Sequence, residues 1–215
     1  MILLDLVEEN IFEIILNSGV LGIAILGVLL ILSIAALAIY FSKFFSISRA
    51  QKVDQTFINN VQKSMKEGDV ETALKLCKAK NSSISRMIEK GIKRIGRPMT
   101  DIKEAVENVG NLEIFRLEKG LSQLATIAGA APMIGFFGTV TGMILAFREM
   151  ALTENASNSD LASGIYQALL TTAFGLFVGI FAYLGYNHLT SMVNKVVYNM
   201  ERESMDFLDL LQDPA

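Results

Sequence analysis

Three long stretches of the chain carry no Asp, Glu, Lys or Arg: residues 14–42, 120–147 and 161–194. Each is longer than the ~20 apolar residues that an α-helix needs to cross the hydrocarbon core of a bilayer. The pattern therefore predicts three membrane-spanning helices, at 19–41, 122–147 and 164–187. The first of these is almost uniformly aliphatic, which favours a position facing lipid.

Outside the spans, the spacing of apolar residues predicts helices over most of the chain. Residues 1–18 carry acidic and apolar side chains on opposite faces, as expected for an amphipathic helix on the outer membrane surface. The same spacing predicts a helical region over residues 42–121. It also predicts a C-terminal helix over residues 188–215, continuing from the third span. Residues 148–163, between the second and third spans, are predicted to form a loop.

Polar residues mark the expected helix ends between the first two spans. Asp69 can cap a short helix, and Ser83 precedes a stripe of isoleucines spaced about four residues apart. The run 96–98, Gly-Arg-Pro, predicts a break, after which Thr100 can cap the next helix. Because no stop signal follows before residue 147, this helix is predicted to run unbroken into the second span, with a kink near Pro132.

Composition agrees with a membrane protein. Of the 215 residues, 52% are hydrophobic and 19% are charged, against ~25% charged in an ordinary soluble domain. The mean hydropathy is +0.43. These values exclude a soluble enzyme and a disordered chain, and the single cysteine, Cys77, excludes a disulfide-stapled secreted domain. Cys77 itself is interpreted as a structural residue.

The distribution of charge predicts the topology. Residues 42–121 hold 16 of the 19 basic residues, against 10 acidic ones, whereas residues 1–18 hold four acids and no Lys or Arg. Basic residues close to the ends of spans stay on the cytoplasmic side. We therefore expect 42–121 and the C-terminus to be cytoplasmic, and the N-terminus and the loop 148–163 to lie outside.

The second and third spans differ from the first in their many small residues. Glycine and alanine recur there at helical spacing, which allows two helix backbones to approach closely, and close approach is what brings helices together in lipid. The pattern leaves open whether the contact is within one chain or between chains. The predicted packing positions are Ala131, Pro132, Gly135, Gly138, Gly142, Gly175 and Gly179.

A few polar residues lie on or beside these faces: Thr139 and Thr141 in the second span, and Gln167, Thr171 and Thr172 in the third. Each threonine could simply bond back to a carbonyl of its own helix. Their clustering at the small-residue faces favours the other interpretation, in which they line a polar path through the membrane.

None of the three spans contains Asp, Glu, Lys or Arg, which a transporter or pump usually carries for coupling. No nucleophile–base pair, HExxH, CxxC or phosphate-binding loop is present, and the single histidine, His188, lies at the inner edge of the third span. We therefore predict a protein that is not an enzyme, with no metal, no cofactor and no nucleic-acid partner.

Two segments resemble a known family. APMIGFFGTVTGM (131–143) is similar to the second-span motif AP-x-x-GLFGTV-x-G of the ExbB/TolQ proton-channel family. GIYQALLTTAFGLFVGIFAYLGYN (164–187) resembles its third-span pattern, in which GI-x-EAL is followed by TA-x-GL, a proline-containing stretch and YN. The three-span architecture also fits, better than the four spans of the MotA-type flagellar stators.

The resemblance implies an all-α homo-oligomer of the bacterial inner membrane, a pentamer in the family picture. Such an oligomer surrounds a small single-span partner of the ExbD/TolR type and drives a TonB- or TolA-type protein with ion flow. The family's two pore threonines correspond to Thr139 and Thr172. The family's span-three glutamate corresponds to Gln167 here, and the proline after the third-span glycines is absent.

Several alternatives stay open at this stage. The resemblance is closest to ExbB and so favours TonB-type output, and Tol-type envelope maintenance is the alternative. A transporter subunit of unknown substrate and a membrane scaffold without flux are further possibilities. The conducted ion, proton or sodium, is not determined by the motifs.

Overall fold

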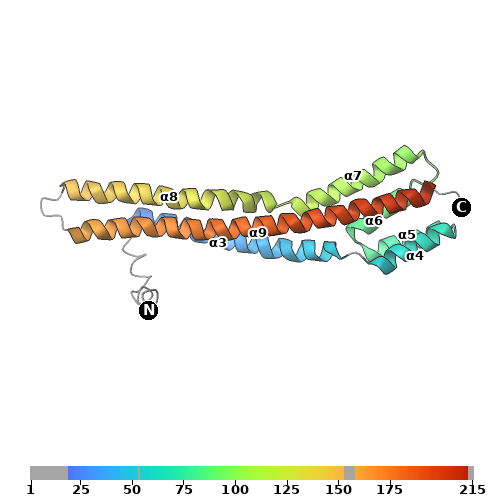
Figure 1. Cartoon of the computed structure of the whole chain (residues 1–215), viewed down its shortest axis with the longest axis horizontal. Helices are drawn as coiled ribbons and strands as arrows, with labels where there is room; N and C mark the ends of the chain where they lie inside the picture. The colour runs from blue at the N-terminus through green and yellow to red at the C-terminus, as the bar shows by residue number, and fades with distance from the viewer. Residues whose placement is uncertain (1–18, 53, 153–157, 213–215) are drawn as a thin grey trace. The chain divides into compact units, whose positions relative to one another are not determined.

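The computed structural model describes residues 19–52, 54–152 and 158–212, and this part of the chain is helical without strands. The amphipathic helix predicted for 1–18 lies outside the described residues. Figure 1 shows the elements in chain order. They are α3 (Gly19–Gln51), α4 (Gln55–Lys66), α5 (Val70–Lys80), α6 (Ser83–Ile92), α7 (Met99–Glu118), α8 (Leu121–Leu152) and α9 (Asn158–Gln212).

Three of the described helical segments are long and apolar enough to cross a membrane: Val20–Gln51, Met99–Leu152 and Leu161–Gln212. The prediction of an all-α protein with three membrane-spanning helices is therefore confirmed. Helices α8 and α9 extend into the segment 148–163, which was predicted to be a loop. Because α8 continues to Leu152 and α9 begins at Asn158, much of the segment 148–163 is helical.

The chain divides into two compact units. The first combines the chain up to Tyr40 with Ser122–Asn187, so its described part holds α3 up to Tyr40, α8 from Ser122 and α9 up to Asn187. The second combines Phe41–Leu121 with the chain from His188 onward, and contains α4 to α7. Helices α3 and α9 contribute residues to both units.

Within the second unit, side-chain caps fix where the short helices begin. The Asp69 carboxylate accepts a hydrogen bond from the Thr72 amide (3.0 Å), which confirms the predicted cap of α5. Ser82, directly before Ser83, caps α6 and forms a reciprocal capping box with Ser85. The predicted Thr100 cap is wrong: Pro98 occupies the N-cap position of α7, and no side chain there bonds to the helix.

The helix predicted to run unbroken from Thr100 to residue 147 is interrupted. It ends at Glu118 and restarts at Leu121, and Gly120 between them has φ +95°. This left-handed conformation is open to glycine and ends helices readily. The Lys43 ammonium donates a hydrogen bond to the Arg116 carbonyl (3.2 Å), one of the last in α7. Further along, α8 continues through Pro132.

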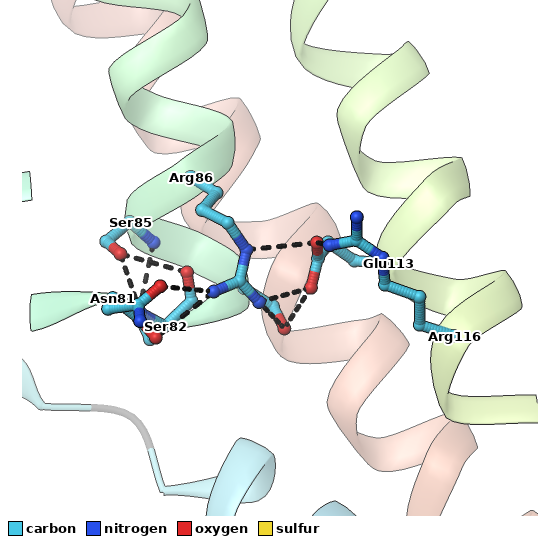
Figure 2. A network of polar contacts seen from close by, with 7 residues as sticks. Asn81, Ser82, Ser85, Arg86, Glu113 and Arg116 are labelled. Carbon is cyan, nitrogen blue, oxygen red and sulfur yellow. Dashed lines mark hydrogen bonds and ion pairs between the residues drawn. The ribbon is translucent and has the colours of Figure 1, made fainter. Parts of the chain in front are cut away.

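A buried ionic network joins α6 to α7 in the second unit (Figure 2). Glu113 of α7 is 3% exposed and accepts hydrogen bonds from the Ser83 hydroxyl (3.0 Å) and from Nε of Arg86 (3.0 Å). The Arg86 Nη2 group also pairs with it, and Arg116 Nη1 lies 2.6 Å from Oε1. Burial alone would raise the pKa of Glu113, but bonds from Arg86 and Ser83 and the charge of Arg116 outweigh it and lower the pKa.

Candidate functional site

Helices α8 and α9 pack backbone against backbone at two facing glycines. A Cβ atom on Gly135 would lie 2.7 Å from the Thr171 carbonyl oxygen and 3.0 Å from the Cα of Gly175. A Cβ on Gly175 would lie 2.6 Å from the Ala131 carbonyl oxygen and 2.8 Å from the Cα of Gly135. Since the obstructing atoms are backbone, no side chain could move aside, and only glycine fits at either position.

The other predicted packing positions flank this crossing. Gly138 faces the Thr171 side chain, and Gly179 faces the ring of Pro132. A Cβ on Gly142 would lie 2.8 Å from the Cβ of Ala168. Ala131 is fully buried. The structure thus places all seven positions where α8 meets α9 within one chain, a choice that the sequence pattern left open.

The close approach brings Thr139 of α8 against Thr172 of α9, and their hydroxyl groups are hydrogen-bonded to each other. Each hydroxyl has one proton, and a carbonyl of the facing helix is a further acceptor within reach of each: Ala168 lies 3.1 Å from the Thr139 hydroxyl, and Gly135 lies 3.1 Å from the Thr172 hydroxyl. The bond from Thr139 back to its own helix, at Gly135, is longer at 3.4 Å. These two hydroxyls therefore bridge the helices more than they serve their own.

Thr171, which the sequence did not place among the site residues, belongs to the same cluster. It is 2% exposed, and its hydroxyl lies 2.7 Å from the Ala168 carbonyl and 3.1 Å from the Gly135 carbonyl. The Gly135 carbonyl is thus shared by Thr171 and Thr172. The available signal was the consecutive threonine pair, of which the family motif marks only the second. We call Thr139, Thr171 and Thr172 the threonine cluster.

The remaining polar candidates lie apart from the threonine cluster. Thr141 bonds back to the Phe137 and Gly138 carbonyls (2.8 and 3.2 Å), so its own helix accounts for it. The half-buried Gln167 donates to the Ser163 hydroxyl (3.4 Å), one turn toward the start of α9, and five residues from Thr172. The structure therefore brings Thr139 and Thr172 together and leaves Gln167 ~7.5 Å away along the helix axis.

The cluster can orient an ion or water but cannot hold a charge. Threonine hydroxyls donate and accept hydrogen bonds and do not ionise near neutral pH. In the described parts of the chain, no group of three or more His, Cys, Asp or Glu is arranged to hold a metal ion. The arrangement suits passage or orientation of a small polar species at the contact of two membrane helices.

Comparison with known proteins gives a consistent result. The model of the MotA/TolQ/ExbB proton channel family matches residues 79–202, a segment that includes α8 and most of α9. An ExbB homologue of Methanothermobacter thermautotrophicus is 34% identical over 144 residues, covering 67% of this chain and 51% of the relative. A TolQ protein of the Tol-Pal system from Haemophilus influenzae is 40% identical over 99 residues, covering 46% and 42%.

A third relative is similar over a longer region. An ExbB-like biopolymer transport protein of Synechocystis is 29% identical over 195 residues, covering 89% of this chain and 74% of the relative. The chain spans about half the length of the first two relatives, 51% and 42%. Names of both the ExbB and the TolQ type therefore occur among the similar proteins.

Proposed function

Since this chain belongs to the MotA/TolQ/ExbB proton channel family, we propose that it is the channel-forming subunit of a complex that converts ion flow into mechanical work. The observation that carries this proposal is the hydroxyl pair of Thr139 and Thr172, which joins two membrane helices where they are in contact. These two hydroxyls lie beside the facing glycines and are polar groups on a helix surface that is otherwise apolar. They would line the path of the ion.

The titrating group of this path would come from a partner. The three predicted spans contain no carboxylate, and Gln167 stands where the family has a glutamate. An ion crossing a low-dielectric core needs a group that binds and releases it. We infer that an acidic residue in the single span of an ExbD/TolR-like protein supplies it, with Thr139 and Thr172 arranged around that residue.

Oligomerisation follows from the same reasoning. The described part of one chain offers three helices that could span a membrane, too few to enclose a partner helix. We propose a ring of identical chains, a pentamer as in the family picture, with the small-residue helices α8 and α9 toward the centre and α3 toward lipid. The proposed location is a bacterial inner membrane, with the second unit on the cytoplasmic side as the charge distribution predicts.

The test is Thr172→Val in the complex with its partner, reconstituted in vesicles. Valine keeps the shape of threonine and removes the hydroxyl, so the complex should assemble at its native mass while ion flux falls at least tenfold. Thr126→Val is the matched control, because the Thr126 hydroxyl bonds only to the Ser122 carbonyl of its own helix (2.9 Å) among the described contacts. Flux at the wild-type level in Thr172→Val would contradict the proposal.

A second measurement concerns the partner. Vesicles that hold this chain alone should show no steady flux, and flux should appear when the ExbD/TolR-like protein is added. Steady flux without the partner would show that the titrating group is in this chain. Gln167→Glu is expected to retain flux, because the role of the carboxylate would already be filled.

We propose a TonB-type protein as the recipient of the work. Tol-type output is the second candidate, and the observation that favours it is the 40% identity to the Haemophilus influenzae TolQ protein. Deletion of the gene separates them: loss of outer-membrane nutrient import supports the first, and leakage of the envelope supports the second.

A further inference from the structure

The first unit contains a cavity of about 480 Å³ between α3, α8 and α9. This is far above the ~10–15 Å³ that a cavity needs to hold one water, so there is room for a group of waters. Thr171 forms part of its wall, so the cavity reaches the threonine cluster. From there it extends toward the ends of α8 and α9 that the connecting segment joins, where Glu149 and Ser163 line it.

Along α9, the polar residues of the wall form a ladder. Ser163, Gln167 and Thr171 follow one another at intervals of four residues, and all three line the cavity. They share one helix face, and the ladder is ~12 Å long. The Gln167 amide donates to the Ser163 hydroxyl (3.4 Å), so the polar groups are in contact over part of this length.

The inner end of the ladder connects to the proposed ion path. The Thr171 hydroxyl lies 2.7 Å from the Ala168 carbonyl and 3.1 Å from the Gly135 carbonyl, and the Gly135 oxygen also lies 3.1 Å from the Thr172 hydroxyl. A polar route therefore leads from the cavity to the pair of Thr139 and Thr172 without leaving the chain. This route lies within one chain, beside the helix α3.

The outer end carries negative charge. Among the described residues of the cavity wall, Glu149 is the one ionisable group. It is exposed, three residues before the end of α8 at Leu152. A carboxylate at the mouth of a cleft with low-dielectric walls raises the local concentration of cations and lowers that of anions. The described residues of the wall include no Lys, Arg or His, so no positive side chain there would neutralise an anion.

We propose that this cavity is a hydrated entry vestibule that admits monovalent cations to the threonine cluster of the same protomer, with Glu149 as the charge that concentrates them. The proposal rests on the proposed function of the chain as an ion-channel subunit. It also gives Gln167 a role that requires no charge: its amide is the middle step of the polar ladder. Hydrated protons and sodium ions share the chemistry that this vestibule would select.

The vestibule can be tested by thiol labelling, which does not depend on ion flux. In a Cys77→Ala background, the assembled complex in membranes would carry either Ile25→Cys or Ile31→Cys. Both residues lie on α3, but Ile25 is 7% exposed and lines the cavity, whereas Ile31 is 67% exposed. Water-soluble methanethiosulfonates should modify Ile25→Cys at least tenfold faster than Ile31→Cys. Equal or slower modification of Ile25→Cys would overturn the proposal, whether lipid or a second chain fills the space.

The charge of the reagent then tests Glu149. We expect a trimethylammonium methanethiosulfonate to modify Ile25→Cys faster than a sulfonate reagent of similar size. Glu149→Gln should lower this rate ratio about three- to tenfold, because it removes the carboxylate and keeps the side-chain shape. Arg148→Gln is the control, since it changes the charge at the neighbouring position, which is not part of the wall, and should not lower the ratio. An unchanged ratio in Glu149→Gln would overturn the role of Glu149.

Flux measurements on the same Glu149→Gln complex separate this proposal from the proposed function. If wild-type complex conducts, the variant should need a three- to tenfold higher cation concentration for half-maximal flux, with proton and sodium flux measured in parallel to identify the ion. Conduction in the wild type with an unchanged half-maximal concentration in the variant overturns the vestibule alone. A wild-type complex without flux overturns the channel function, and the labelling result still decides whether the cavity is hydrated.

Discussion

Removing the charge of Glu113 should loosen the second unit measurably. In Glu113→Gln the side chain keeps its shape, but Arg86 and Arg116 lose their shared counter-ion (Figure 2). Breaking a buried ion pair costs about 3–5 kcal/mol. The two arginine side chains are 35% and 67% exposed and can turn to water, so we expect a lower loss of about 2–3 kcal/mol in the opening free energy of the unit.

Cys77 provides the assay. It is 1% exposed, and burial, with a smaller contribution from Glu89, raises the pKa of its thiol to about 12. It should therefore react with maleimide only when the unit opens, in proportion to the open population. A loss of 2–3 kcal/mol raises that population about 30- to 150-fold, since 1.36 kcal/mol corresponds to a factor of ten.

The control for this measurement is Glu107→Gln on the same helix. Glu107 is exposed and its distance to Lys103 is 3.8 Å, and such a surface pair contributes ~0.3–0.5 kcal/mol. Cys77 labelling should therefore rise no more than about twofold in the control. If Glu113→Gln labels no faster than Glu107→Gln, the buried network does not stabilise the unit and the reasoning fails.

Three further predictions follow from the same contacts. Gly175→Leu should prevent assembly of a native-sized, active complex, because its side chain would overlap the backbone of α8. Gly129→Leu should be tolerated, since a Cβ there meets nothing within 4 Å. Native mass spectrometry measures the mass of both complexes. Gly91→Val should destabilise the second unit by about 1–3 kcal/mol, because its Cβ would lie 2.5 Å from the Phe207 ring, and faster Cys77 labelling would report it. Because the pKa of Glu113 is lowered in the folded chain, its contribution to stability is present above ~pH 4.3 and is lost as pH falls through the folded pKa; circular dichroism should show a flatter acid profile in Glu113→Gln.

The spans could be predicted from the sequence because lipid imposes a strict rule on it. A helix surrounded by hydrocarbon must satisfy its backbone internally and carry apolar side chains over ~20 residues, so the charge-free windows marked α3, α8 and α9 correctly. The glycine faces were visible for the same reason, since small residues recur at helical spacing. Which helix each face meets is a tertiary property, and the contact of Thr139 with Thr172, 33 residues apart, has no local signature.

The errors have identifiable physical causes. Apolar residues recur at helical spacing on both sides of Lys119 and Gly120, and this regular spacing concealed the end of α7. A glycine after a helix with a basic last turn is nevertheless a recognised stop signal. The charged residues after 147 suggested a loop, but Arg148 and Glu149 are good helix formers, and α8 includes both. In the sequence, Glu113 is one more charged residue on a polar helix. Its burial depends on the ion pair with Arg86 of α6, a tertiary contact without a local signal.

The two proposals together account for the substitution at position 167. If the titrating carboxylate belongs to the partner, position 167 needs no charge of its own and has only to continue the polar path toward the threonine cluster. Gln167 offers the dipole of an amide without that charge, in contact with Ser163. Negative charge would then stand only at the entrance, on Glu149, and at the proposed partner carboxylate beside the threonine cluster. In this arrangement the strongest binding position along the path belongs to the proposed partner, so an ion reaching it would change the charge of the partner and not of this chain.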